Sequence, residues 1–405
     1  MKNGVNKMKK HAIRNVLLSL VLCLSILLTS CNIGSIIDSF GSIGNSNTEN
    51  SNTNSGNDDT NENGTTENNE NLNNGTPNGG NNVGEENKGS SDGEEESKMW
   101  VYSTDRNGVT VRDLKIKTKK GGEAVTIIQI SDIHFNYCNE QDFEEANPAI
   151  MSTYEYRTWL KDGKSLNNAL KCLEYAEDAD QLVITGDTLD YLSYGALEMA
   201  KENIFDVYPD AFVALGDHEV ERQMEGKVED TSTLESRYEL LEQYWPHDLF
   251  YSSVVLEDKV MIIQMDNSSA NGFLDCQVEP FKRDMQLARE NDYTVLLFFH
   301  TNLRTNNYAY RYAKSTFAGA SSGTSPVNLM ENGVGRSRSS ASAIIYDIIV
   351  NNADVIGACF CGHMHSDYYT EIVAKNADGT DALIPQYILV GASYTKGHVL
   401  RITVE

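Results

Sequence analysis

Five of the eight histidines in this 405-residue chain follow short hydrophobic runs, next to carboxylates or to one another. The blocks read Asp132-Ile133-His134, Gly186-Asp187, Gly216-Asp217-His218-Glu219, His300 and Gly362-His363-Met364-His365. Imidazole together with carboxylate suits Zn, Fe, Mn or Co rather than Ca or Mg alone. A single Gly-Asp is usually a turn, and a single histidine is usually a packed or surface residue. Five such blocks at five run ends instead indicate a metal centre.

These blocks offer more ligands than one metal ion needs. Two metal ions about 3.5 to 4 Å apart, bridged by one carboxylate, would use them all. The spacing of Asp132 with His134, and of His363 with His365, predicts that each pair projects from the same side of an extended segment.

These residues can form one site only if strands bring them together. Nearly continuous hydrophobic runs predict strands covered on both faces at 124–131, 181–186, 211–216, 260–265, 294–299, 355–362, 387–392 and 398–404. Amphipathic or apolar stretches predict helices at 166–173, 232–245, 278–291 and 343–350. The alternation predicts an α/β layered domain, in which loops leaving the carboxyl ends of the strands gather at one edge.

In this order the blocks resemble the motifs of the calcineurin-like metallophosphoesterases: Asp-x-His, Gly-Asp, Gly-Asn-His-Asp/Glu, a single His and Gly-His-x-His. The resemblance covers about residues 124–404. It implies an α/β fold, a four-layer α/β/β/α sandwich of two mixed sheets packed face to face with helices outside.

The resemblance also assigns roles to eight residues. The implied ligands are Asp132, His134 and His365 for a first metal, Asp217, His300 and His363 for a second, and Asp187 as the bridge. His218 corresponds to the family's group that contacts the phosphate and protonates the leaving oxygen.

The implied activity is metal-dependent hydrolysis of a phosphomonoester or phosphodiester by a hydroxide that bridges two divalent metal ions (Mn, Fe, Zn or Co). The expected partner is a phosphate-ester substrate. The competing hypothesis is a surface lipoprotein with a degenerate phosphoesterase fold that acts as a binding module. A metal-scavenging lipoprotein is weaker, since storage needs neither a bridging carboxylate nor an adjacent acid.

The chain departs from the family pattern in two ways. Asp217 replaces the family's asparagine, and the added charge predicts either a preference for singly charged diesters or a site with one trivalent iron. The connections are also long, with 53 residues from His134 to Asp187 and an insertion at 301–340. That insertion carries five basic residues and one acid, so it is either a substrate lid or a solvated surface loop.

The N-terminal quarter of the chain reads as targeting and tether. Residues 1–31 have a basic start, an apolar run and Leu28-Thr29-Ser30-Cys31, which resembles a lipobox and predicts a lipoprotein signal with lipid on Cys31. The alternatives are an uncleaved anchor and simple secretion. Residues 32–98 are rich in Asn, Gly, Ser and Glu and predict a disordered tether, which leaves 99–405 as the catalytic domain. We therefore expect an exported protein, anchored in the cell membrane, with its catalytic domain outside the cytoplasm.

Net charge limits the classes of partner to expect, and cysteine content limits the disulfides. The net charge of −26 divides into +5 for residues 1–31, −11 for 32–98 and −20 for 99–405. An acidic domain argues against nucleic-acid binding, whereas bound metal cations keep phosphate esters possible. The odd number of cysteines left after Cys23 and Cys31 predicts buried free thiols rather than disulfides.

Overall fold

The computed structural model describes residues 101–220, 232–269, 272–303, 339–365, 367–394 and 396–405. The predicted signal with Cys31, the tether at 32–98 and most of the 301–340 insertion lie outside the described residues. Within the described ranges, no helix has both the length and the apolar character needed to cross a membrane.

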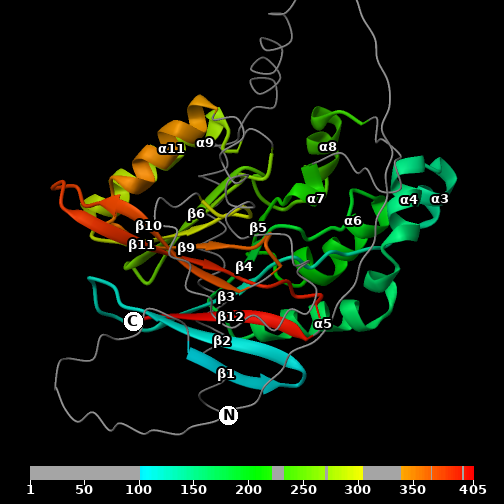
Figure 1. Cartoon of the computed structure of the whole chain (residues 1–405), viewed down its shortest axis with the longest axis horizontal. Coiled ribbons are helices and arrows are strands. Elements are labelled where there is room, and N and C mark those ends of the chain that lie inside the picture. The colour runs from blue at the N-terminus through cyan, green and yellow to red at the C-terminus, as the bar shows by residue number, and fades with distance from the viewer. Residues whose placement is uncertain (1–100, 221–231, 270–271, 304–338, 366, 395) are drawn as a thin grey trace, which may run out of the picture. The chain divides into compact units, whose positions relative to one another are not determined.

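The first sheet contains six strands of mixed direction (Figure 1). In spatial order they are β1 (Val101–Arg106), β2 (Val109–Ile116), β12 (Gly397–Val404), β3 (Val125–Ile130), β4 (Gln181–Thr185) and β5 (Phe212–Ala214). β1 and β2 form a hairpin around Asn107 and Gly108, whose φ angles of 55° and 82° suit a tight hairpin turn. Because β3, β4 and β5 are parallel, the residues that follow them meet at one edge.

The second sheet is also mixed and has six strands. In spatial order they are β10 (Tyr368–Lys375), β11 (Asp381–Ile388), β9 (Ile356–Cys361), β8 (Thr294–Phe298), β7 (Val260–Met265) and β6 (Tyr251–Leu256). β7, β8 and β9 are parallel, while the hairpin pairs β10–β11 and β6–β7 are antiparallel. His300 and the Gly-His-x-His block therefore leave neighbouring strands at the same edge.

Alternate residues of single strands separate the two hydrophobic cores. On β7, Val260 and Ile262 enter the core between the sheets, whereas Met261 and Ile263 enter the core beneath the helices. α9 (Asp275–Glu290) and α11 (Ser340–Val350) cover the outer face of the second sheet, and α5 (Lys164–Leu173) packs against β12 and β2 of the first (Figure 1). This arrangement confirms the predicted four-layer sandwich.

Shorter elements lie in the connections. They are α3 (Glu140–Glu145), α4 (Pro148–Tyr156), η1 (Thr158–Lys161), η2 (Glu174–Ala176), α6 (Tyr194–Ala200), η3 (Lys201–Phe205), α7 (Asp217–Val220) and α8 (Leu234–Leu241). α3, α4 and η1 occupy the long connection between His134 and Asp187. α3 begins where the Asn139 side chain accepts a hydrogen bond from the backbone of Asp142.

Seven of the eight predicted strand runs coincide with strands, and one requires correction. The run at 387–392 is only the end of β11, because the segment after Ile388 leaves the second sheet and Ala392 donates its N–H to the carbonyl of Ser131, after β3. β1, β2, β6 and β10 were not predicted, since polar residues interrupt their hydrophobic patterns. The free-thiol prediction is confirmed for the described cysteines, although Cys276 is only partly buried.

Candidate metal centre

The loops that carry the predicted ligands adopt left-handed backbone conformations. Positive φ angles from 48° to 68° occur at Asp132, His134, Asp187, His363 and His365. Residues other than glycine avoid this region, and the few that are held in it are concentrated at functional sites. The prediction of extended segments at Asp-x-His and His-x-His is therefore wrong. The turns keep the first pair in one group and send the two histidines of the second pair to different groups.

The first group contains Asp132, His134, Asp187 and His365. Nε2 of His134 lies 3.1 Å from Nε2 of His365, which is 3.0 Å from Oδ1 of Asp132. Oδ2 of Asp187 lies 3.7 Å from Nε2 of His134. One donor atom from each of the four residues lies within 4.8 Å of the others, so the group can surround one cation.

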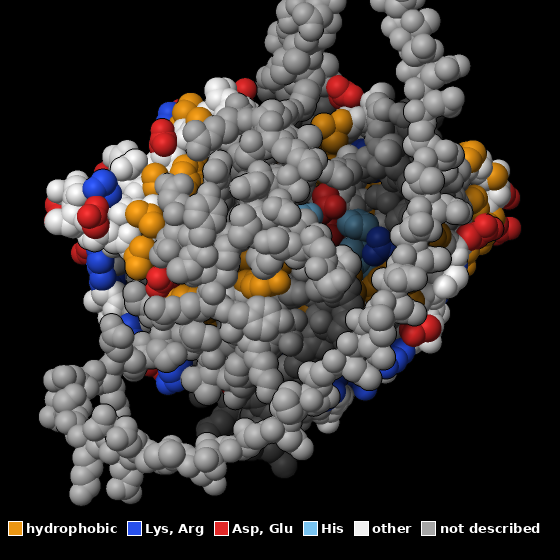
Figure 2. Space-filling model, in the orientation of Figure 1, with side chains coloured by type: hydrophobic (Ala, Val, Ile, Leu, Met, Phe, Trp, Pro, Cys, Tyr) orange, Lys and Arg blue, Asp and Glu red, His pale blue; other side chains and the backbone are white. Residues whose placement is uncertain are grey.

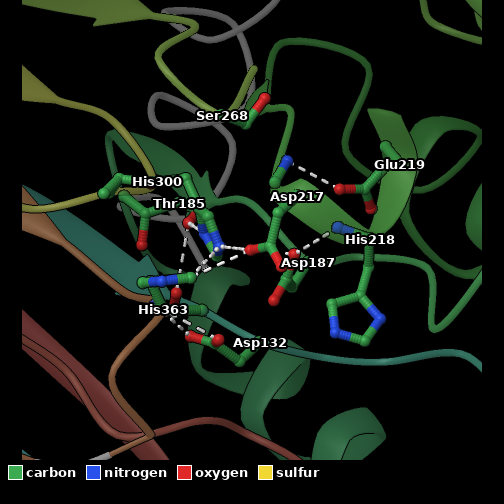
Figure 3. A network of polar contacts seen from close by, with 12 residues as sticks. Asp132, Thr185, Asp187, Asp217, His218, Glu219, Ser268, His300 and His363 are labelled. Carbon is green, nitrogen blue, oxygen red and sulfur yellow. Dashed lines mark hydrogen bonds and ion pairs between the residues drawn. The ribbon is translucent and has the colours of Figure 1, made fainter. Parts of the chain in front are cut away.

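The second group contains Asp187, Asp217, His300 and His363. Oδ1 of Asp217 lies 2.8 Å from Nε2 of His300 and 2.9 Å from Nδ1 of His363, and the two nitrogens are 3.2 Å apart. Figure 3 shows both histidines converging on Asp217 from one side, with His218 on the other. The donor set is again mixed imidazole and carboxylate.

Asp187 is the residue that the two groups share. Its Oδ2 faces His134, and its Oδ1 lies 3.3 Å from Nε2 of His300. The side chain is only 2% exposed, and it lies between Asp132 and Asp217 in Figure 3. This is the position that the resemblance implies for a bridging carboxylate.

Two motif glycines allow the blocks to approach one another. A Cβ atom at Gly216 would overlap the carboxylate of Asp187, and one at Gly362 would overlap Ser131 and the carboxylate of Asp132. The glycines are therefore required because the backbone of one block lies directly against a ligand of another.

The protonation states of Asp217 and His134 suit cation binding. In the metal-free centre, nearby aspartates outweigh burial and raise the pKa of His300 and His363. Burial acts to raise the pKa of Asp217, but His363 and His300 hold it well below its usual range. Burial lowers the pKa of His134 well below its ordinary value, and His218 and His365 add to this effect. An ionised carboxylate and a neutral imidazole are the forms that bind metals.

His218 belongs to a third group, with His134 and Asp190. Its backbone N–H donates to Oδ1 of Asp187 at 3.1 Å, and its Nδ1 lies 2.7 Å from the carbonyl oxygen of Asp190. Burial opposes protonation, but Asp187, Asp217 and Asp190 outweigh it and raise the pKa of His218 to about 9. The side chain is 17% exposed, so the ring is partly open to solvent.

The structure adds three supporting residues that the sequence analysis did not assign. Asp190 contacts His134 and His218, and Tyr394 places its hydroxyl 2.6 Å from Nδ1 of His365. Glu219 accepts hydrogen bonds from the backbone of Leu189 and Gly216, and burial, reinforced by Asp187, raises its pKa to about 8. Glu219 lies within the third polar block and Asp190 lies three residues after the second, so both are close enough to the blocks to be noted from the sequence. Tyr394 lies two residues after the run at 387–392, and the hydrophobic pattern of that run gives no sign of a site residue there.

A buried ion pair fixes the loop after β9 from the far side. Arg112 on β2 pairs with Asp367, two residues beyond His365, and its Nη1 lies 3.0 Å from Nδ1 of His398 on β12. Both charged side chains are at most 1% exposed. Burial raises the pKa of Asp367 to about 6, although Arg112 opposes the shift. The first sheet thus holds the loop that carries His363 and His365.

The site residues fit metal ions on the chemistry of their donors. Three carboxylates and four imidazoles form two groups of four that share one carboxylate, and in each group two imidazole nitrogens face each other at about hydrogen-bond distance. Imidazole nitrogens and carboxylate oxygens that converge in this way form a donor set that a cation can occupy.

Comparisons with known proteins agree with this centre. The model of the calcineurin-like phosphoesterase family matches residues 125–367. A comparison with curated proteins found no match.

Several solved structures resemble the chain at low identity. A dimetal phosphatase from Danio rerio is 12% identical, with a TM-score of 0.36, over 67% of this chain and 88% of that one. The purple acid phosphatase from yellow lupin (Lupinus luteus) seeds is 13% identical, with a TM-score of 0.37, over 67% of this chain and 45% of that one. A calcineurin-like phosphoesterase from Bacillus subtilis is 12% identical, with a TM-score of 0.26, over 67% of this chain and 82% of that one.

The family match spans more than half of the chain and includes all five polar blocks. The chain therefore belongs to the calcineurin-like phosphoesterase family.

Proposed function

We propose that the chain is a two-metal hydrolase of phosphomonoesters or phosphodiesters. The observation that carries the proposal is the position of Asp187, whose two carboxylate oxygens face two different groups of ligand-type side chains. A carboxylate shared by two cation sites is the arrangement that two-metal phosphoesterases require.

The residues that would hold the metals follow from the two groups. Asp132, His134 and His365 would hold the first ion, Asp217, His300 and His363 the second, and Asp187 both. Bound divalent ions would supply Lewis acidity, lowering the pKa of a water and offsetting charge on the phosphoryl oxygens. The chain keeps these ligands in place through the left-handed turns and the buried pair of Arg112 and Asp367.

His218 is placed to donate a proton to the leaving group. Its Nδ1 faces the carbonyl oxygen of Asp190, which can only accept, so Nδ1 carries a hydrogen. Nε2 is the other ring nitrogen, and when it carries a proton it can serve as the general acid. The backbone contact to Asp187 keeps His218 beside the ligand groups, and the proposal assigns His218 as the acid rather than as a ligand.

All seven expected ligands lie in the two groups, which favours an enzyme over a binding module with a degenerate site. To test this, metal is removed from the purified full-length chain, and Mn, Zn, Fe, Co or Mg is returned separately. Hydrolysis of p-nitrophenyl phosphate and of bis(p-nitrophenyl) phosphate is then measured. We expect chelation to abolish hydrolysis and at least one metal to restore it. A metal-binding chain that hydrolyses neither ester would instead favour the binding module.

We also propose that the chain is exported and held at the membrane by lipid on Cys31. The support is the order of residues 1–31 and the polar composition of 32–98. In a bacterial host, Cys31→Ser should release the protein from membranes or leave an unprocessed precursor. A processed, membrane-bound Cys31→Ser variant would reject this part of the proposal.

A further inference from the structure

A basic side chain reaches the metal centre from outside the five polar blocks. Arg157 lies between α4 and η1, in the long connection between His134 and Asp187. Its Nε lies 3.0 Å from Oδ1 of Asp190, and its side chain is 15% exposed. The connection therefore does more than cover the sheet, because it delivers a guanidinium to the site.

Asp190 places this guanidinium beside the two histidines of the third group. The same Oδ1 atom lies 3.3 Å from Nδ1 of His134 and 3.7 Å from Nδ1 of His218. Asp190 and His134 are fully buried, whereas His218 and Arg157 are partly exposed. Arg157 and His218 are thus partly open to solvent, as Asp217, His363 and His365 are, at 22% to 26%. Figure 2 shows acidic, basic and histidine side chains close together on one face of the molecule.

Aromatic contacts keep Arg157 in this position. Its guanidinium carbon lies 5.7 Å from the centre of the Trp159 ring, a cation–π distance. Trp159 packs on Tyr394 with ring centres 5.3 Å apart, and the Tyr394 hydroxyl contacts His365. A continuous line of contacts therefore runs from Arg157 to the first ligand group. A group held on two sides loses little entropy when it binds an anion.

The chemistry of the guanidinium suits a phosphoryl group. Arginine is permanently charged and offers five N–H donors in one plane, so pairing with a carboxylate is compatible with a further contact to phosphate. Asp217 removes one unit of positive charge relative to the family's asparagine. A fixed cation at the edge of the site would offset that loss for an incoming anion.

We propose that Arg157 is a substrate-binding residue of this chain, which donates to a phosphoryl oxygen on the side of His218. The proposal rests on the proposed function, since it names a contact within the same site. It predicts that Arg157 contributes to binding of the phosphoryl group itself, independently of the leaving group.

Inorganic phosphate is the probe, because its binding can be measured by calorimetry on the metal-loaded full chain whether or not hydrolysis occurs. Arg157→Gln should weaken phosphate binding by about 10- to 100-fold, the usual loss for a charge-assisted hydrogen bond. It should also raise KM for p-nitrophenyl phosphate, with metal content unchanged. The phosphate affinity of Arg157→Lys should fall between those of Arg157→Gln and the wild type, because the charge remains and the planar fork is lost.

Arg283→Gln is the matched control, since Arg283 pairs with Asp284 through the same nitrogen, at 2.9 Å, on α9. It should leave phosphate binding and KM unchanged. If Arg157 only positions Asp190, then Arg157→Gln and Asp190→Asn should both lower kcat and leave phosphate affinity intact. That result would overturn the proposal. A wild-type chain that binds phosphate through Arg157 but hydrolyses no ester would refute the proposed function and leave the assigned contact standing.

Discussion

The carboxylate of Asp217 lies 2.9 Å from the Nδ1 atom of His363. The nearby histidines keep its pKa well below the usual range despite burial, so the charge that distinguishes Asp217 from the family's asparagine is present in the folded chain. An ionised aspartate at a ligand position lowers the attraction of the site for a doubly charged monoester more than for a singly charged diester.

Asp217→Asn should therefore raise the ratio of monoesterase to diesterase activity. One charge about 5 Å away is worth roughly 3 kcal/mol at an effective dielectric constant of about 20, so we expect at least a tenfold rise. The ratio is measured on matched p-nitrophenyl esters, with metal content determined in parallel. An unchanged ratio at equal metal occupancy would show that the carboxylate has no electrostatic effect on substrate choice.

His218→Ala should retain the metal content of the wild type and lose rate. A missing general acid typically costs about 10²- to 10⁴-fold, and the loss should be largest for esters with poor leaving groups. Rates are compared across phenyl esters of graded leaving-group pKa. Loss of one metal equivalent in this variant would make His218 a ligand instead.

The pKa of His218 should be observable in the metal-free chain. Its folded-state pKa of about 9 lies above the ordinary value near 6.5, so the imidazolium stabilises the fold fully below about pH 6.5, and this contribution is lost as the pH rises through about 9. Asp190→Asn should lower the pKa, since Asp190 is one of three carboxylates that raise it. NMR titration of the His218 ring protons measures the pKa in the wild type and in Asp190→Asn. Equal pKa values would contradict the role of Asp190 in raising the pKa of His218.

Arg112→Met should destabilise the chain by leaving the carboxyl of Asp367 buried without its cation. Removal of one partner of a buried pair costs roughly 3–5 kcal/mol, whereas replacing both with apolar residues is often neutral. The double variant Arg112→Met with Asp367→Leu should therefore recover much of the stability. Urea unfolding of the metal-free chain measures the free energy of unfolding of the single and the double variant. A single variant as stable as the wild type would remove the pair from the account of how the loop after β9 is held.

The sequence was most informative where chemistry and hydrophobic runs coincide. Runs such as that of β7 predicted strands because both faces are buried, and the blocks that follow them predicted the two ligand groups. Spacing alone could not show that Asp132 and His363 have left-handed backbones, because that strain is imposed by the packing of one block against another.

The sequence also could not predict the contacts between distant segments. Arg112 and Asp367 are separated by 255 residues, and neither lies in one of the polar blocks. Arg157 lies in a connection for which the sequence indicates the length but not the contacts. Its contact with Asp190 depends on the turn between α4 and η1, which no local pattern specified.

The central claim is that Asp187 joins two metal ions. The most direct measurement compares metal equivalents per chain and ester hydrolysis in the wild type, in Asp187→Asn and in Asp284→Asn, a buried aspartate on α9 that serves as the control. The account predicts two equivalents in the wild type and the control, and both reduced metal and almost no hydrolysis in Asp187→Asn. An Asp187→Asn variant that binds two metal ions and hydrolyses esters at the wild-type rate would contradict it.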